Sequence, residues 1–167
     1  LLQFDGYNAS DLANYMSLAG YTNVPLENVL LDGFNGVPSP FGGEGEVCLD
    51  IEACIAMAPA LEKVVVFEAG PFGNANDILS AMVARNEIKQ ISASWGYQTD
   101  ATSDQFYQQM AVQGQTFFNA SGDSDAWVGP IQYGSVQNPY ITIVGGTTLT
   151  INGQAVSYDS ETVWNDR

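Results

Sequence analysis

Two periodicities of apolar residues alternate along the chain. Short stretches that are apolar throughout, or at every second position, predict strands. Longer stretches with apolar residues every three or four positions predict helices. The predicted strands cover residues 1–4, 28–32, 63–68, 90–95, 116–120 and 140–144, and the predicted helices cover residues 8–18, 46–58, 76–87 and 103–111. A hairpin is predicted at 147–151 and 154–158, because the intervening Asn152-Gly153 is a strong turn signal.

The order of these elements, strand followed by helix, predicts an α/β domain with a mainly parallel sheet. The run from Lys63 to Glu68 is apolar through its middle, which is typical of a strand covered on both faces. The chain has 167 residues, which suits one domain with a real core. In such sheets the working residues gather at the carboxyl ends of the strands. Residues 94–96, residues 121–124 and the loop before the helix at 46–58 fall there.

The helix at 46–58 carries two carboxylates among apolar residues. Glu46 and Asp50 are four positions apart, so they lie one above the other on the same helix face. One reading is structural, because the helix dipole favours acids in the first turn. The other is chemical, because two coupled carboxyl groups can transfer protons. These residues alone leave both readings open.

The charge of the chain is strongly one-sided. Nineteen Asp and Glu residues stand against four Lys and Arg residues, for a formal net charge of −15. Such a surface repels nucleic acid and anionic membranes, and it suits a protein that works in acid. No apolar run approaches the roughly 20 residues of a membrane span. We therefore expect neither a nucleic-acid partner nor a membrane partner.

The chain has no histidine, which excludes Ser-His-Asp and Cys-His catalysis within it and removes the commonest metal ligand. Its two cysteines, Cys48 and Cys54, fall on one predicted helix about 9 Å apart along the axis, too far for a disulfide. We expect both to be small buried apolar residues.

Several motifs in order along the chain resemble the sedolisins, the serine-carboxyl peptidases, which are acid proteases with a subtilisin-like fold. The motifs are Gly-Glu-Val-Cys-Leu-Asp-Ile-Glu at 45–52, Ile-Ser-Ala-Ser-Trp-Gly at 91–96, Ala-Ser-Gly-Asp-Ser at 120–124, Val-Gly-Gly-Thr-Thr-Leu at 144–149 and Glu-Thr-Val-Trp-Asn-Asp at 161–166. Each motif alone is weak, but their order and spacing together are specific. The resemblance implies a subtilisin-like three-layer α/β fold, incomplete in this chain, with residues 1–167 forming the N-terminal portion of the catalytic domain.

Carried over position by position, the resemblance implies a role for each matched residue. Glu46 matches the general base, Asp50 its partner, and Asp123 the oxyanion-hole aspartate. The segment Ser94-Trp95-Gly96 matches the strand that pairs with an extended polypeptide substrate. A carboxylate base and a protonated carboxyl donor both work best at low pH, so the implied activity is endopeptidase activity in an acidic, extracellular environment.

Two features of the family have no counterpart here. The family's nucleophilic serine lies in a Gly-Thr-Ser segment further along, and neither residues 145–148 nor residues 157–160 fit it. Its calcium site also belongs to the C-terminal part, so we expect no cofactor in this chain. The chain is then one half of a cleaved protease with the serine on a second chain, a shortened piece, or a natural fragment without catalysis; we favour the first.

Two other functions compete with this reading. One is a catalytically inactive peptide-binding or scaffold domain that keeps the substrate groove. The other is a glycosidase that uses Glu46 and Asp50. We rank the glycosidase low, because two carboxylates on one helix face point the same way and do not flank a sugar.

Overall fold

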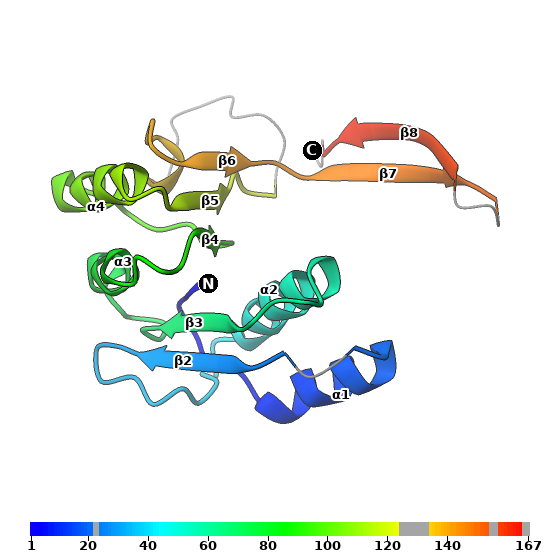
Figure 1. Ribbon diagram of the computed structural model, residues 1–167, viewed down its shortest axis with the longest axis horizontal. Helices are drawn as coiled ribbons and strands as arrows, with labels where there is room; N and C mark the ends of the chain where they lie inside the picture. Colours follow the sequence, from blue (N-terminus) through cyan, green and yellow to red (C-terminus); the bar gives the residue numbers. More distant parts are fainter. Residues whose placement is uncertain (22–23, 124–133, 154–156, 165–167) are drawn as a thin grey trace.

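The computed structural model describes residues 1–21, 24–123, 134–153 and 157–164. Within these ranges strands and helices alternate as the sequence predicts, in an α/β fold (Figure 1). The helices are α1 (Ala9–Ala19), α2 (Glu44–Met57), α3 (Ala75–Ala84) and α4 (Ala101–Val112), with a 3₁₀ turn at Gly134–Val136. The strands are β1 (Leu2–Gln3), β2 (Leu26–Leu30), β3 (Val64–Glu68), β4 (Gln90–Ala93), β5 (Thr116–Ala120), β6 (Thr142–Val144), β7 (Thr147–Asn152) and β8 (Ser157–Val163). Each of the helices is too short to cross a membrane.

The strands form two parallel three-stranded sheets and an antiparallel hairpin. The first sheet has the order β1-β3-β2 and the second the order β4-β5-β6, and β1 contacts β4 between them. Strand β3 is buried along its whole length, as its unbroken apolar run predicts. Its side chains alternate between faces: Val64 and Val66 pack toward α1 and α2, whereas Val65 and Phe67 pack toward α3 and α4. Helices therefore cover both faces of the sheet, which gives three layers.

Two apolar clusters hold these layers together. The first joins α1 and α2 to the sheet through fully buried side chains: Leu12, Val47, Ile51, Ile55 and Val66. The second joins α3 and α4 to the other face through another set: Leu79, Met82, Tyr107, Met110 and Phe117. On α2 the buried residues occur every fourth position, so the opposite face of this helix is free to carry polar groups.

The connections after β1 and β2 meet at one edge of the sheet. The side chain that ties them is Asp5, which follows β1 and is 1% exposed. Its carboxylate accepts hydrogen bonds from the backbone N–H groups of Gly6, Ser39 and Gly43 and from the Ser39 hydroxyl. Burial raises the pKa of Asp5, but these hydrogen bonds outweigh it and hold the pKa below its ordinary value. The long loop before α2 is thereby fixed to the end of β1.

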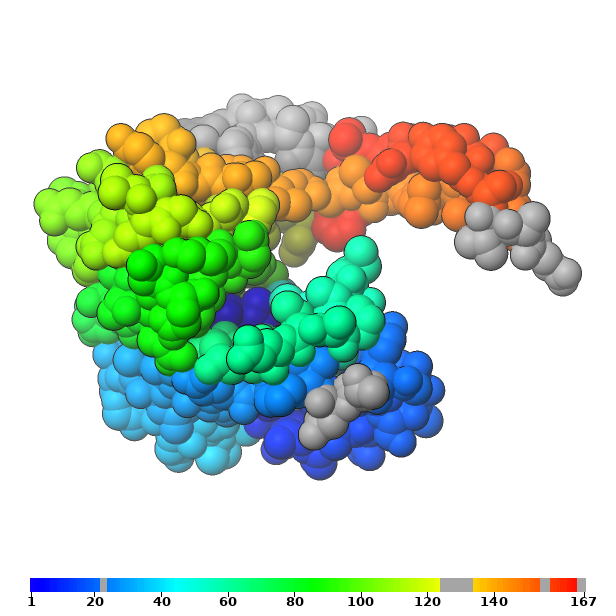
Figure 2. All heavy atoms as spheres, viewed as in Figure 1, coloured from blue at the N-terminus to red at the C-terminus, as the bar shows by residue number. Residues whose placement is uncertain are grey.

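The hairpin of β7 and β8 is exposed along both strands. It extends beyond the layered body as an arm (Figures 1 and 2). The predicted two-residue turn at Asn152-Gly153 is wrong, because Asn152 is the last residue of β7 and pairs with Ser157. Gly153 follows the strand with a positive φ of 54°, a conformation that favours glycine. The second strand was placed wrongly from sequence, because it covers Ser157–Val163 rather than 154–158, and residues 154–156 lie outside the described ranges.

Smaller differences also separate the predicted elements from the observed ones. Strand β2 begins two residues earlier than expected, at Leu26. Helix α4 is capped by Asp100 and not by Ser103 or Asp104, because the Asp100 carboxylate accepts from the N–H groups of the first turn. Cys48 and Cys54 carry free thiols, but both are half-buried rather than buried, since they flank the apolar stripe of α2 instead of lying in it.

Candidate active site

A chain of hydrogen bonds fixes the Asp50 carboxylate at the edge where the strands end. Its Oδ2 accepts from Gln3 Nε2 at 2.7 Å, and its Oδ1 accepts from Ser94 Oγ at 2.6 Å. The indole Nε1 of Trp95 donates in turn to Gln3 Oε1 at 2.7 Å. Residues from β1, α2 and the end of β4 are thus joined in one network, and both oxygens of Asp50 have defined donors.

The local sequence explains how these groups meet. Gln3 ends β1 and is 0% exposed, so its polar amide needs partners inside the protein. Ser94 and Trp95 directly follow β4, which lies beside β1. Asp50 lies in the middle of α2, and its carboxylate reaches both Gln3 and Ser94. Side chains from three elements therefore converge without any long loop between them.

Glu46 lies one helical turn before Asp50, in the first turn of α2. Burial raises its pKa above the ordinary value, and the charges of Asp50 and Asp123 raise it further, whereas a hydrogen bond with the Ser94 side chain lowers it. Burial likewise raises the pKa of Asp50, against hydrogen bonds from Ser94 and Gln3 that lower it. Both carboxyl groups therefore hold a proton at a higher pH than an exposed acid does. A raised pKa in a coupled pair is a frequent property of catalytic acids.

Asp123 follows β5 and is exposed. Its charge acts on Glu46, so the two carboxyl groups share the same edge of the molecule rather than opposite sides. The preceding Gly122 has a φ of 103°, a conformation that favours glycine and turns the chain sharply after the strand. Ser124, the last residue of this motif, lies outside the described ranges.

The segment Ser94-Trp95-Gly96 is positioned at the same edge, but two of its side chains are engaged inside the protein. The Ser94 hydroxyl contacts the carboxyl pair, and the Trp95 ring packs edge-on against Phe4 with centroids 5.8 Å apart. Gly96 is exposed. The Ser94 and Trp95 side chains therefore belong to the hydrogen-bond network around Asp50.

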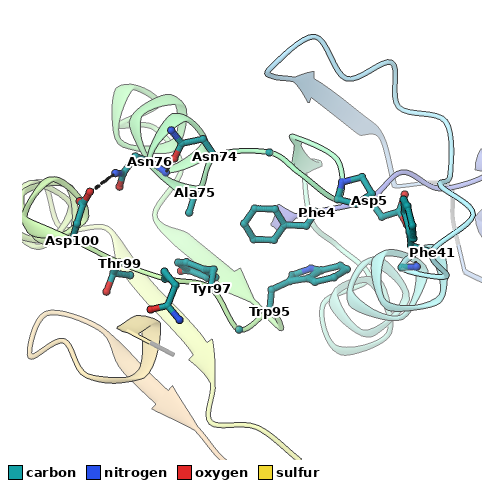
Figure 3. A pocket seen from close by; sticks show the side chains of 15 residues that line it. Phe4, Asp5, Phe41, Asn74, Ala75, Asn76, Trp95, Tyr97, Thr99 and Asp100 are labelled. Carbon is teal, nitrogen blue, oxygen red and sulfur yellow. Dashed lines mark hydrogen bonds between the residues drawn. The ribbon is translucent and has the colours of Figure 1, made fainter. Parts of the chain in front are cut away.

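A pocket of about 570 Å³ opens beside this network (Figure 3). Trp95 lines it, so its indole separates the pocket from Gln3 and Asp50. The other lining residues come from the ends of β1, β3 and β4 and from the loop before α2: Phe4, Asp5, Phe41, Gly43, Pro71, Gly73, Asn74, Ala75, Asn76, Gly96, Tyr97, Gln98, Thr99 and Asp100.

The contribution of Gln3 was missed from sequence. Its signal was a polar residue inside a stretch that was otherwise apolar, Leu1-Leu2-Gln3-Phe4. Such a residue in a buried strand has to be hydrogen-bonded, which marks it as part of a network. Among the described residues, no group of three or more acidic, cysteine or histidine side chains gathers to hold a metal ion.

Known proteins resemble the chain in sequence. No family model matches it. Kumamolisin of Bacillus sp. (strain MN-32) is 32% identical over 178 residues, which cover 96% of this chain and 32% of that protein. Sedolisin of Pseudomonas sp. (strain 101) is 28% identical over 181 residues, covering 93% of this chain and 30% of sedolisin. Xanthomonalisin of Xanthomonas sp. (strain T-22) is 27% identical over 199 residues, covering 94% and 24%.

The chain also resembles a solved structure in its fold. Pseudomonas sedolisin, solved as a serine-carboxyl proteinase complexed with two molecules of pseudo-iodotyrostatin, superposes with a TM-score of 0.84 at 25% sequence identity. The match covers 99% of this chain and 52% of that one. The chain spans about a third or less of the length of the curated relatives it matches. On its sequence and its fold together, the chain belongs to the sedolisin family of serine-carboxyl peptidases.

Proposed function

We propose that this chain is the N-terminal portion of an acid serine-carboxyl endopeptidase that hydrolyses polypeptides in an extracellular, acidic environment. Glu46 acts as the general base, Asp50 orients it, and Asp123 contributes to the oxyanion hole. A second chain or a further segment supplies the serine nucleophile, and the family's calcium site belongs with that part. The observation that carries this proposal is the coupled pair of Glu46 and Asp50, held at the strand ends within reach of the Asp123 charge.

The geometry suits proton transfer in acid. A general base works best when its pKa lies near the working pH, and burial and the charge of Asp50 raise the pKa of Glu46 above its ordinary value. The hydrogen bonds from Gln3 and Ser94 keep the Asp50 carboxylate in one orientation, so Glu46 has a fixed partner with which to share a proton. Glu46 can then take the proton of an attacking hydroxyl and later return it to the leaving amine.

Asp123 has to donate a hydrogen bond, whereas Glu46 has to accept a proton. It is exposed at the end of β5, on the same edge as Glu46. A protonated carboxyl there can donate a hydrogen bond to the oxyanion that forms on the scissile carbonyl. Removing one oxyanion donor typically costs about 10²–10³ in rate. Both roles require low pH, since one group has to accept a proton and the other has to keep one.

The test is the substitution Glu46→Gln in the protein that carries this chain, assayed on unfolded protein at pH 4. Loss of a general base lowers the rate by about 10²–10⁴, and we expect a loss of that size with the fold retained. The matched control is Glu44→Gln, which removes the same charge from the same turn of α2, where Glu44 bonds Asn8 instead of the network. Equal activity of the two variants would overturn the assignment of Glu46.

The alternative is a peptide-binding domain without catalysis. One observation is consistent with it: Ser157 and Ser160, in the segment that does not fit the family's nucleophile, lie on the exposed strand β8. This alternative predicts that peptides bind across the pH range and remain intact. Cleavage that depends on Glu46 would exclude it.

A further inference from the structure

The pocket beside Trp95 joins an apolar wall to an acidic rim. Its wall consists of the aromatic rings of Phe4, Trp95 and Tyr97, and its rim carries Asn76 and Asp100 (Figure 3). The hydroxyl of Tyr97 bonds that of Tyr107 in the core, so Tyr97 offers its ring rather than its hydroxyl. A side chain that fills this space has to be apolar along its length and compatible with negative charge at its end.

Asp100 places that charge at the rim. It is the N-cap of α4, and its Oδ1 accepts from the N–H groups of Thr102 and Ser103. Asn76 Nδ2 lies 3.2 Å from each carboxylate oxygen. Since Oδ2 accepts that one hydrogen bond while the side chain is exposed, it keeps a lone pair for a further donor. These hydrogen bonds, first those of the backbone, lower the pKa of Asp100, so it keeps its charge in acid.

The cationic side chains of the described residues lie far from this pocket, which leaves its edge negatively charged. In the described part of the chain the cationic side chains are Lys63, Arg85 and Lys89. Lys63 directly precedes β3 and Lys89 directly precedes β4, so both lie at the edge opposite to the pocket, and Arg85 pairs with Glu27 of β2. A strand of four or five residues separates the two edges by about 15 Å. The pocket edge thus holds Asp5, Asp100 and the carboxyl pair, with no cationic side chain of the described residues among them.

From the pocket's composition and this separation of charge, we infer that the pocket binds the side chain of a lysine or arginine of the peptide substrate. The methylene stem of that residue packs on the aromatic rings, and its cationic head reaches Oδ2 of Asp100, which has a lone pair left beside its hydrogen bond from Asn76. The inference rests on the proposed function and adds a preference for basic peptides to it. The negative edge also attracts such peptides before they bind.

The test compares peptides in the protein that carries this chain. Each peptide places Lys, Gln, Leu or Glu at one position, and the position is moved along the peptide. At one position we expect kcat/KM for Lys to exceed that for Leu by about tenfold at pH 4. Asp100→Asn keeps the helix cap, because Asn caps as well as Asp, and should reduce this preference to about twofold. Glu62→Gln removes the same charge beside Lys63 at the far edge and should leave the preference unchanged.

A preference for Leu over Lys at every position, or a Lys preference that Asp100→Asn leaves intact, would overturn the inference while peptide cleavage stands. A binding assay tests the pocket independently of the peptidase proposal. It measures, by fluorescence anisotropy, how tightly labelled Lys and Gln peptides bind to the Glu46→Gln protein. If no peptide is cleaved but Lys peptides still bind tighter through Asp100, the pocket assignment holds and the peptidase proposal fails. Equal binding of Lys and Gln peptides would contradict the pocket assignment.

Discussion

Glu68 gives a stability prediction whose size follows from the structure. It ends β3 and is 0% exposed, and neither carboxyl oxygen has a hydrogen-bond partner among the described residues. Burial, and to a lesser degree the charge of Asp5, raises its pKa from the ordinary 4.5 to about 7. A carboxyl group whose pKa is raised by folding stabilises the fold below its unfolded pKa, and that stability is lost as pH rises toward the folded pKa.

The magnitude is a few kcal/mol. A rise from 4.5 to about 7 corresponds to about 3 kcal/mol between pH 4 and pH 8, at about 1.4 kcal/mol per pH unit. Glu68→Gln keeps the shape but cannot ionise. Its free energy of unfolding should therefore match that of the natural protein within about 1 kcal/mol at pH 4 and exceed it by about 3 kcal/mol at pH 8.

Urea unfolding at the two pH values measures both differences, with Glu52→Gln on the surface of α2 as the control for a lost charge. The reasoning would be refuted if the gap between Glu68→Gln and the natural protein were the same at pH 4 and pH 8. The same outcome would show that Glu68 finds a partner or water that the packing around β3 does not reveal.

Two further substitutions probe the network around Asp50. Ser94→Ala removes the hydrogen bonds that lower the pKa of Glu46 and of Asp50, so the acidic limb of the pH–rate profile should move to higher pH with activity retained; complete loss of activity would instead make the Ser94 hydroxyl itself the reacting group. Trp95→Phe keeps the ring beside Phe4 but leaves the buried Gln3 oxygen without its donor, so urea unfolding should show a loss of about 1–3 kcal/mol. Trp164→Phe on the hairpin is the control and should change little; equal effects of the two Trp variants would contradict the network.

Much of the fold was predictable because apolar periodicity reports burial directly. The unbroken apolar run at Val64–Phe67 predicted a strand covered on both faces. The spacing of four residues between Val47, Ile51 and Ile55 predicted the buried stripe of α2. Strand β8 was misplaced because its residues are all exposed, so no apolar alternation marks its ends. Where no core fixes which face of a strand is buried, the sequence pattern does not indicate where the strand begins and ends.

Glu46 lies in the first turn of α2, Asp50 in its middle, and Asp123 after β5. Their catalytic roles stay predictions, which rest on the sequence motifs. These motifs did not show that Gln3 reaches across from β1, or that Ser94 donates to Asp50, because a one-dimensional pattern carries no information on which side chains meet between elements. The burial of Glu68 was not predicted from the sequence either, because a charged residue at a strand end is usually solvated, whereas the fold buries this one.

The account depends most on Glu46 working as a base in acid beside a proton-donating carboxyl group. The most direct measurement is the dependence of kcat/KM on pH from 2 to 8 for the protein that carries this chain, beside its Glu46→Gln variant. The account predicts a rate that rises as Glu46 ionises, falls toward neutral pH as the donor loses its proton, and is low at every pH in the variant. A rate that is highest at or above pH 7, or a variant with the same profile as the natural protein, would contradict it.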